Sequence, residues 1–168
     1  MAIKFKINER KAVESVLWLI KRGESDMYKI FKMLFAAEKH HLNKHGRPIT
    51  GQQYLAMPLG TVPSWIYDVA IHQIGIGFYK AGRVLVAERD YIRKFFSESD
   101  MESLEFGYKE YETLDFTRVK DKNHKEPAWI HTWARRGISK RKPIPFEKLI
   151  DEPWLRKELK ELSAFMVI

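Results

Sequence analysis

Apolar residues at helical spacing mark the first element of the chain. The positions that share one face are Val13, Val16, Leu17 and Ile20. Asn8 lies before them as a candidate N-cap, and Gly23 follows them as a residue that ends helices. The pattern therefore predicts a first helix between these two residues.

A second and broader apolar face begins a few residues later. It consists of Met27, Ile30, Phe31, Leu34 and Phe35. Ser25 is the candidate N-cap, and the pattern continues to His41 or Leu42 and ends before Gly46. A helix with so wide an apolar face is expected in the centre of the core, with Leu34 pointing inward.

Turn-forming residues separate this helix from shorter elements. Gly46, Arg47 and Pro48 form a turn, and residues 52–57 are expected to be extended. Pro58, Gly60 and Pro63 are expected to interrupt that extended piece. A third helix is predicted to start at Pro63, because proline suits the first turn of a helix. Its inner face should consist of Ile66, Val69 and Ala70.

The middle of the chain predicts a hairpin followed by two helices. Two β-prone runs, residues 76–79 and 84–87, flank the turn residues Ala81 and Gly82. Ser97, followed three residues later by Asp100, forms a candidate capping box. The fourth helix should bury Met101, Leu104, Tyr108 and Tyr111, and a short fifth helix should be anchored by Phe116 and Val119.

The last third of the chain mixes one helix with a basic loop. Glu126 and Pro127 open a sixth helix, on which Trp129 and Trp133 lie four apart on one side. Gly137 is expected to end it, and a basic loop should lead to Pro145 and then to short helical pieces. The whole pattern predicts an α+β, helix-dominated fold, a compact multi-helix domain with a small β-hairpin. No linker divides residues 1–168, so we expect a single domain.

Composition narrows the compartment and the chemistry. The chain has 168 residues and no cysteine, which excludes disulfides, cysteine-based zinc sites and a thiol nucleophile. The first residues show no apolar signal-peptide core, and no apolar run is long enough to span a bilayer. We therefore expect a cytoplasmic protein that does not contact a membrane.

The formal net charge of +8 is concentrated in one stretch. Residues 118–142 contain nine basic and two acidic residues. The densest group is Arg135, Arg136, Lys140, Arg141 and Lys142. Such a stretch attracts an acidic protein surface or a nucleic acid, and it is equally typical of a solvated loop. We take these five residues as the candidate partner-binding set.

Several motifs together resemble a known family. Residues 29–37 match a helix of the form K-x-x-K-L-L-Y-F-A, and His41-Leu42 match a following His-Leu pair. Residues 46–51 read Gly-Arg-Pro-Ile-Thr-Gly, and Ala56 with residues 60–68 match an Ala and a Gly-Pro-Val-Pro-Ser turn into a helix ending Leu-Tyr-Asp. These motifs resemble the Panacea (SocA-like) antitoxin domain of bacterial and phage type II toxin–antitoxin systems.

A second block of motifs extends the resemblance to about residue 150. Residues 97–100 with Leu104 resemble an L-S-E-S-D-x-x-x-L helix start, and residues 124–129 resemble a T-H-x-x-P-A-W motif. Thr61 replaces the usual proline of the family, and Asn123 replaces the usual threonine. The family residues to which we assign a structural role are Gly46, Arg47, Pro48, Gly60, Pro63, His124, Pro127 and Trp129.

The resemblance implies a binding protein with no cofactor. Members of this family neutralise co-encoded toxins, mostly by direct binding, so the implied partner is a cognate toxin encoded nearby. One alternative is a proteolytic adaptor that delivers the toxin to a protease. Another is a nucleic-acid-binding regulator that uses the basic stretch, which we do not favour. A homo-oligomer is also left open.

Candidate catalytic and metal-ligating residues have simpler structural explanations. His41 and His45 lie four apart, a spacing that metal sites use, but the sequence supplies no nearby third ligand. His124 could act as a general base, yet no nucleophile or orienting partner accompanies it. Trp129 and Trp133 could stack nucleic-acid bases, although such a pair is more often core packing. We therefore predict that the protein is not an enzyme.

Overall fold

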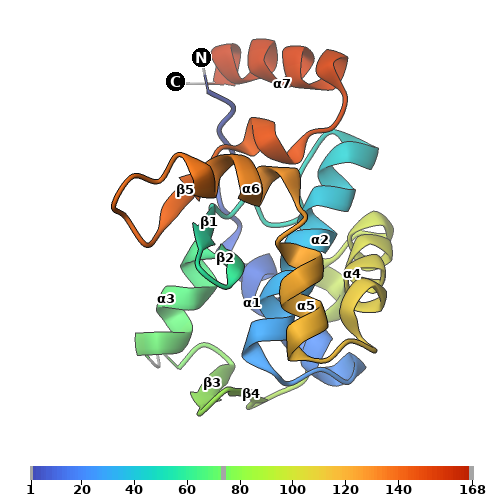
Figure 1. Cartoon of the computed structure of the whole chain (residues 1–168). Helices are drawn as coiled ribbons and strands as arrows, with labels where there is room; N and C mark the ends of the chain where they lie inside the picture. Colours follow the sequence, from blue (N-terminus) through green and yellow to red (C-terminus); the bar gives the residue numbers. More distant parts are fainter. Residues whose placement is uncertain (1, 73–74, 167–168) are drawn as a thin grey trace.

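The computed structural model describes residues 2–72 and 75–166 (Figure 1). The α-helices of this part are α1 (Glu9–Arg22), α2 (Met27–His45), α3 (Ser64–His72), α4 (Glu98–Tyr111), α5 (Phe116–Asn123), α6 (Pro127–Ala134) and α7 (Pro153–Met166). The strands are β1 (Tyr54–Met57), β2 (Gly60–Pro63), β3 (Phe78–Ala81), β4 (Val84–Ala87) and β5 (Lys142–Ile144). Two 3-10 helices complete the order, η1 (Arg93–Phe95) and η2 (Phe146–Leu149). The α+β, helix-dominated class predicted from the sequence is confirmed.

Helix α2 runs through the middle of the molecule (Figure 1). Leu34 is only 3% exposed, which confirms that it points inward. The helix is one turn longer than the apolar pattern indicates and ends where Gly46 adopts a φ of 70°. Helix α4 packs closely on α2 at Gly107, because a Cβ atom there would overlap the backbone oxygen of Met33.

The N-cap of α2 differs from the predicted residue. Asp26, and not Ser25, caps the helix, since its Oδ1 accepts a hydrogen bond from the backbone N of Lys29 at 3.0 Å. The residue before it, Ser25, instead accepts at its backbone carbonyl a 2.8 Å hydrogen bond from the backbone N of Leu85 in β4. The β3–β4 hairpin, predicted from the sequence, is thereby attached to the start of α2.

A three-stranded antiparallel sheet of order β2-β1-β5 lies against α6. Tyr54 pairs with Pro63 on one side and with Ile144 on the other. Pro58 follows the end of β1, as predicted, but the prediction that Gly60 and Pro63 also interrupt the extended structure is wrong. Residues 60–63 form β2, and α3 begins after Pro63 at Ser64. Proline is tolerated here because β2 and β5 are the edge strands of the sheet.

The end of the chain also differs from expectation. Helix α6 stops at Ala134, before Gly137, because the backbone N of Arg135 already bonds the carbonyl of Thr132. Part of the predicted basic loop is strand β5. The expected short helical pieces are η2 and the 14-residue helix α7.

Buried apolar residues form two clusters that share helix α2. The first joins α1, α3, α4 and the β3–β4 hairpin to α2. The second surrounds Phe35 and Tyr54 and includes Trp129 of α6 and Leu155 of α7. Asn8 caps α1, and Ser97 and Asp100 form the complete capping box predicted for α4. The inner faces predicted for α3 and α4 are buried, apart from the partly exposed Met101.

Candidate partner-binding site

The turn after α2 is organised by a buried carboxylate. Glu38 accepts hydrogen bonds from the backbone N of Ile49, Thr50 and Gly51 at 2.9, 3.1 and 2.8 Å. It also accepts a bond from Thr50 Oγ1 at 2.7 Å. Burial raises the pKa of Glu38, while these hydrogen bonds act in the opposite direction. Pro48 belongs to the segment that this carboxylate holds against α2.

A second polar cluster joins α2 to the start of α4. His41 is buried, with Nδ1 at 2.6 Å from the carbonyl oxygen of Arg47 and Nε2 at 2.9 Å from Ser99 Oγ. Asp100 lies behind it and accepts a 2.6 Å hydrogen bond from Lys11 Nζ. The Arg47 guanidinium, 48% exposed, lies 3.6 Å from Asp100. Two motifs distant in sequence therefore meet at His41 and Asp100.

The ionisation of this cluster follows from burial and charge. Burial lowers the pKa of His41, so the ring is neutral at pH 7. Burial acts to raise the pKa of Asp100, but the hydrogen bonds from Lys11 and Ser97 outweigh it and lower the pKa. In the described part of the chain, no three His, Cys, Asp or Glu side chains are arranged to hold a metal ion.

A third cluster surrounds a buried lysine on α2. Lys32 is 0% exposed, and its Nζ donates to the Thr61 carbonyl oxygen at 2.8 Å and lies 4.2 Å from the centre of the Tyr28 ring. No described carboxylate forms an ion pair with Lys32. Burial lowers the pKa of Lys32 to about 7. The amino group of Lys32 is therefore kept inside the protein without a counter-ion.

Asn123 completes this cluster from the end of α5. Its Oδ1 accepts a 2.8 Å hydrogen bond from the backbone N of Thr61, and its Nδ2 donates to Thr61 Oγ1 at 3.0 Å. Gly60 has a φ of 119°, and a Cβ atom there would overlap Asn123 Oδ1. The close approach therefore requires glycine at position 60.

Aromatic rings and one guanidinium form a stack along α6. His124 lies 4.0 Å from Trp129 with an interplanar angle of 8°, and Trp129 lies 5.7 Å from Trp133. The guanidinium of Arg136 stacks over Trp133 at 3.8 Å. Trp129 is 9% exposed and its Nε1 donates to the carbonyl oxygen of Met57 at 2.9 Å. Pro127 is the first residue of this helix. Burial lowers the pKa of His124.

The five candidate binding residues lie between the end of α6 and the first residue of β5, in residues 135–142, which we call the basic segment. The three arginines contact neighbouring elements: Arg135 approaches His131, Arg136 stacks on Trp133, and Arg141 lies 4.0 Å from Asp68. Lys140 and Lys142 are exposed and form no ion pair or hydrogen bond with a described side chain. Arg141 is the residue of the segment that approaches a described carboxylate, so the unneutralised charge lies on Arg135, Arg136, Lys140 and Lys142.

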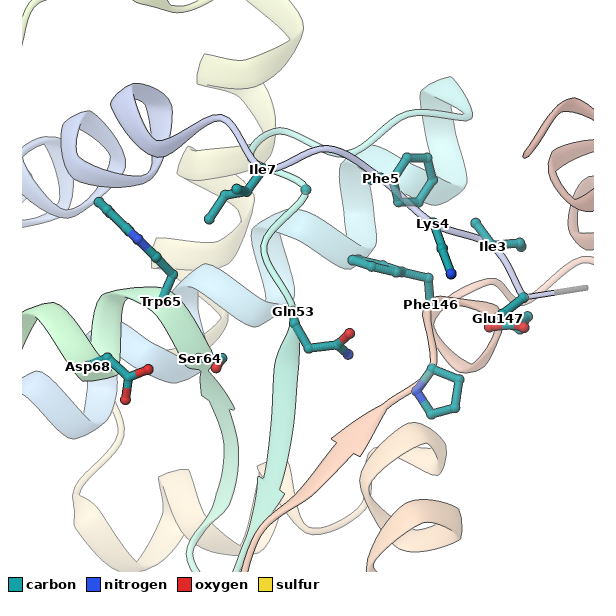
Figure 2. A pocket seen from close by; sticks show the side chains of 13 residues that line it. Ile3, Lys4, Phe5, Ile7, Gln53, Ser64, Trp65, Asp68, Phe146 and Glu147 are labelled. Atoms are coloured by element: carbon teal, nitrogen blue, oxygen red, sulfur yellow. The ribbon is translucent and has the colours of Figure 1, made fainter. Parts of the chain in front are cut away.

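A shallow pocket of about 520 Å³ lies beside the basic segment. Figure 2 shows it between the N-terminal segment, which supplies Phe5, and the sheet with α3, which supplies Trp65 and Asp68. Phe146 forms part of the wall and makes an edge contact with Phe5, at 4.9 Å between ring centres. The pocket is mostly apolar and continues the surface that carries the basic segment, because Arg141 approaches Asp68 at its margin.

A second pocket of about 510 Å³ lies between α2 and α4. His40 and Phe106 stack within it at 4.1 Å, and Lys39 forms a 2.9 Å ion pair with Glu126. Its charged groups are thus paired internally, in contrast to Lys140 and Lys142.

No helix in the described residues is both long enough and apolar enough to cross a membrane.

Comparison with protein families identifies the class of this chain. The profile described as antitoxin SocA-like, Panacea domain matches residues 30–130. The match covers more than half of the chain, which therefore belongs to this family of antitoxin domains. Neither the curated proteins nor the solved structures gave a match.

The geometry also explains the two departures from the family pattern. Thr61 and Asn123 contact each other, and the backbone N–H of Thr61 is the donor that proline would lack.

Sequence reasoning did not single out Lys32 and Glu38, which lie among the apolar residues of α2. The only signal in the sequence was that each charged residue directly follows an apolar residue, Phe31 before Lys32 and Ala37 before Glu38. Both of these apolar residues are buried.

Proposed function

We propose that this protein is an antitoxin that neutralises a co-encoded toxin in the cytoplasm by binding it directly, without catalysis. The observation that carries the proposal is the family match over residues 30–130. The arrangement of the motif residues is compatible with it, because Lys32 and Asp100 are buried in contacts within the fold. These buried polar groups thus support the scaffold.

The basic segment is the proposed contact surface. Its five residues are Arg135, Arg136, Lys140, Arg141 and Lys142. Lys140 and Lys142 carry charges that nothing in the described structure neutralises. Carboxylates on a partner surface would therefore contribute most to binding beside these two lysines. The arginines also stabilise the segment itself through α6 and α3, and their reversal would disturb the fold as well as the interface. The lysines are therefore the better test of binding.

Co-expression with the toxin of the neighbouring gene tests the proposal. We expect growth to be restored and a stable complex to appear on size-exclusion chromatography. Rescue should need at least one antitoxin molecule per toxin molecule, because a binder acts stoichiometrically. Arrested growth while both proteins accumulate intact would contradict the proposal.

Two further arms separate the alternative modes of action. Rescue in a host that lacks its ATP-dependent proteases is expected for blocking and is lost for a proteolytic adaptor. The unneutralised lysines are also compatible with nucleic-acid binding, for which affinity for the operator region should fall steeply with salt. Under the proposal, the toxin complex forms and restores growth without any operator DNA.

A further inference from the structure

The basic segment presents one apolar side chain at its tip. Ile138 has a relative exposure of 105%, and the next most exposed large apolar side chain among the described residues is Phe165 at 81%. Scattered exposed apolar residues are common and prove nothing alone. Ile138 differs because the turn that carries it is held by specific contacts, and basic residues precede and follow it in the sequence.

The turn is closed by hydrogen bonds on both sides of Ile138. The backbone N of Ser139 donates to the Arg136 carbonyl oxygen at 3.3 Å, and Gly137 supplies the φ of 66° within this turn. Ser139 Oγ donates to the carbonyl oxygen of Arg141 at 2.6 Å and accepts from its backbone N at 3.2 Å. These contacts fix the backbone on either side of the exposed isoleucine.

The base of the turn is also anchored. Arg136 donates from Nη1 to the Trp133 carbonyl oxygen at 2.8 Å and stacks on its indole ring. Strand β5 pairs with β1 directly after the turn, through Lys142 and Ala56. A side chain presented by a pre-ordered turn loses little conformational entropy on binding. Ile138 is thus suited to insert into a complementary pocket.

The surroundings of Ile138 define the chemistry of that pocket. Lys140 and Lys142 follow it in sequence and are exposed and unpaired. A surface that accepts the turn must bury an aliphatic side chain and place carboxylates around it. We propose that Ile138 is an apolar anchor that enters an apolar pocket, rimmed by carboxylates, on the protein partner. This inference rests on the proposed antitoxin function.

Two other occupants fit the charge less well. Binding in a DNA groove requires arginine side chains that extend away from the protein, but Arg135 and Arg136 fold back onto α6. An anionic membrane needs more apolar insertion than one isoleucine supplies. A pocket on a protein requires neither extended arginines nor several inserted apolar side chains. Membership of the antitoxin family also implies a protein partner.

The test measures binding of the toxin encoded by the neighbouring gene to wild type and variants, by surface plasmon resonance. Ile138→Ala should weaken the complex about tenfold or more, mainly through faster dissociation, and Ile138→Asp should weaken it further. Ile138→Leu should bind nearly as wild type. Ile71, an exposed isoleucine at the end of α3, provides the control, and Ile71→Ala should leave binding unchanged.

The outcomes separate this inference from the proposed function. If wild type binds the toxin and Ile138→Asp, with an unchanged melting temperature, binds equally well, the anchor is wrong and the antitoxin function stands. If wild type does not bind the toxin, the proposed function itself fails. Loss of binding to phosphatidylglycerol vesicles or duplex DNA in Ile138→Asp, with toxin binding intact, would also overturn the anchor.

Discussion

Replacing the buried lysine of α2 by methionine should stabilise the protein. Lys32 has no counter-ion, and burial lowers its pKa from 10.5 to about 7. At pH 7.5 the unfolded chain holds a proton on Lys32 that the folded chain largely releases. The unfolded-state pKa of 10.5 lies three pH units above pH 7.5, so this release costs about 4 kcal/mol of folding free energy. Methionine follows the same unbranched path and removes this cost.

Lost contacts offset part of that gain. The hydrogen bond to the Thr61 carbonyl oxygen contributes about 0.5–1.5 kcal/mol. The contact between the Lys32 ammonium and the Tyr28 ring contributes up to about 2 kcal/mol when the ammonium is charged. We therefore expect Lys32→Met to raise the free energy of unfolding by about 1–3 kcal/mol at pH 7.5, in line with other replacements of buried charges.

The sign of the pH dependence gives a sharper test. Because the folded-state pKa of Lys32 is lowered, stability rises as the pH increases from 7 toward 10.5. Below pH 7 the contribution of Lys32 no longer changes, because the folded and unfolded chains both hold the proton. Wild type should gain about 3 kcal/mol from Lys32 between pH 7 and 9.5. Tyr28, whose pKa is raised to about 12, stays protonated in this range.

Urea denaturation at several pH values measures both effects. Lys32→Met should lose the rise with pH that wild type shows, and Lys125→Met, at an exposed lysine, provides the baseline. Equal pH slopes for wild type and Lys32→Met would refute the reasoning, because they would show that Lys32 titrates in the folded protein as it does in the unfolded chain.

Three other predictions address the core, the stack and the basic segment. Leu34→Ala should lower the free energy of unfolding by about 2–5 kcal/mol in urea denaturation, and an unchanged curve would place Leu34 outside the core. Trp129→Ala should loosen or unfold the domain in a thermal melt, and His124→Ala should do less. If His124→Ala retained stability and toxin binding but lost rescue, the result would indicate that His124 takes part in a chemical step. Lys140→Glu combined with Lys142→Glu should slow association and reduce its salt dependence, while identical salt slopes would show that the lysines are only solvated.

Helices were predictable from the sequence because their signals are local. The apolar spacing of Val13 and Val16, the Asn8 cap and the Ser97 capping box each lie within one or two turns of the helix they define. The inward position of Leu34 followed from the same spacing. These features depend on neighbours in sequence, which a single chain displays.

Short strands and buried polar groups were not predictable in this way. Strand β5 has three residues, one of them Pro143, and exists because it pairs with β1 almost ninety residues earlier. His41 and Asp100 meet only after α2 and α4 have packed together. Amphipathic spacing also cannot reveal Lys32 and Glu38, because α2 is surrounded by protein over most of its length.

The contact between Thr61 and Asn123 limits how segments can be exchanged between related proteins. A chimera that received proline at position 61 from a relative would leave the Asn123 side-chain oxygen without its backbone donor, in a fully buried site. A chimera that changed only Asn123 would leave the N–H of Thr61 unpaired. Recombination between this chain and a proline-bearing relative should therefore succeed only when the β1–β2 hairpin and the end of α5 come from the same parent.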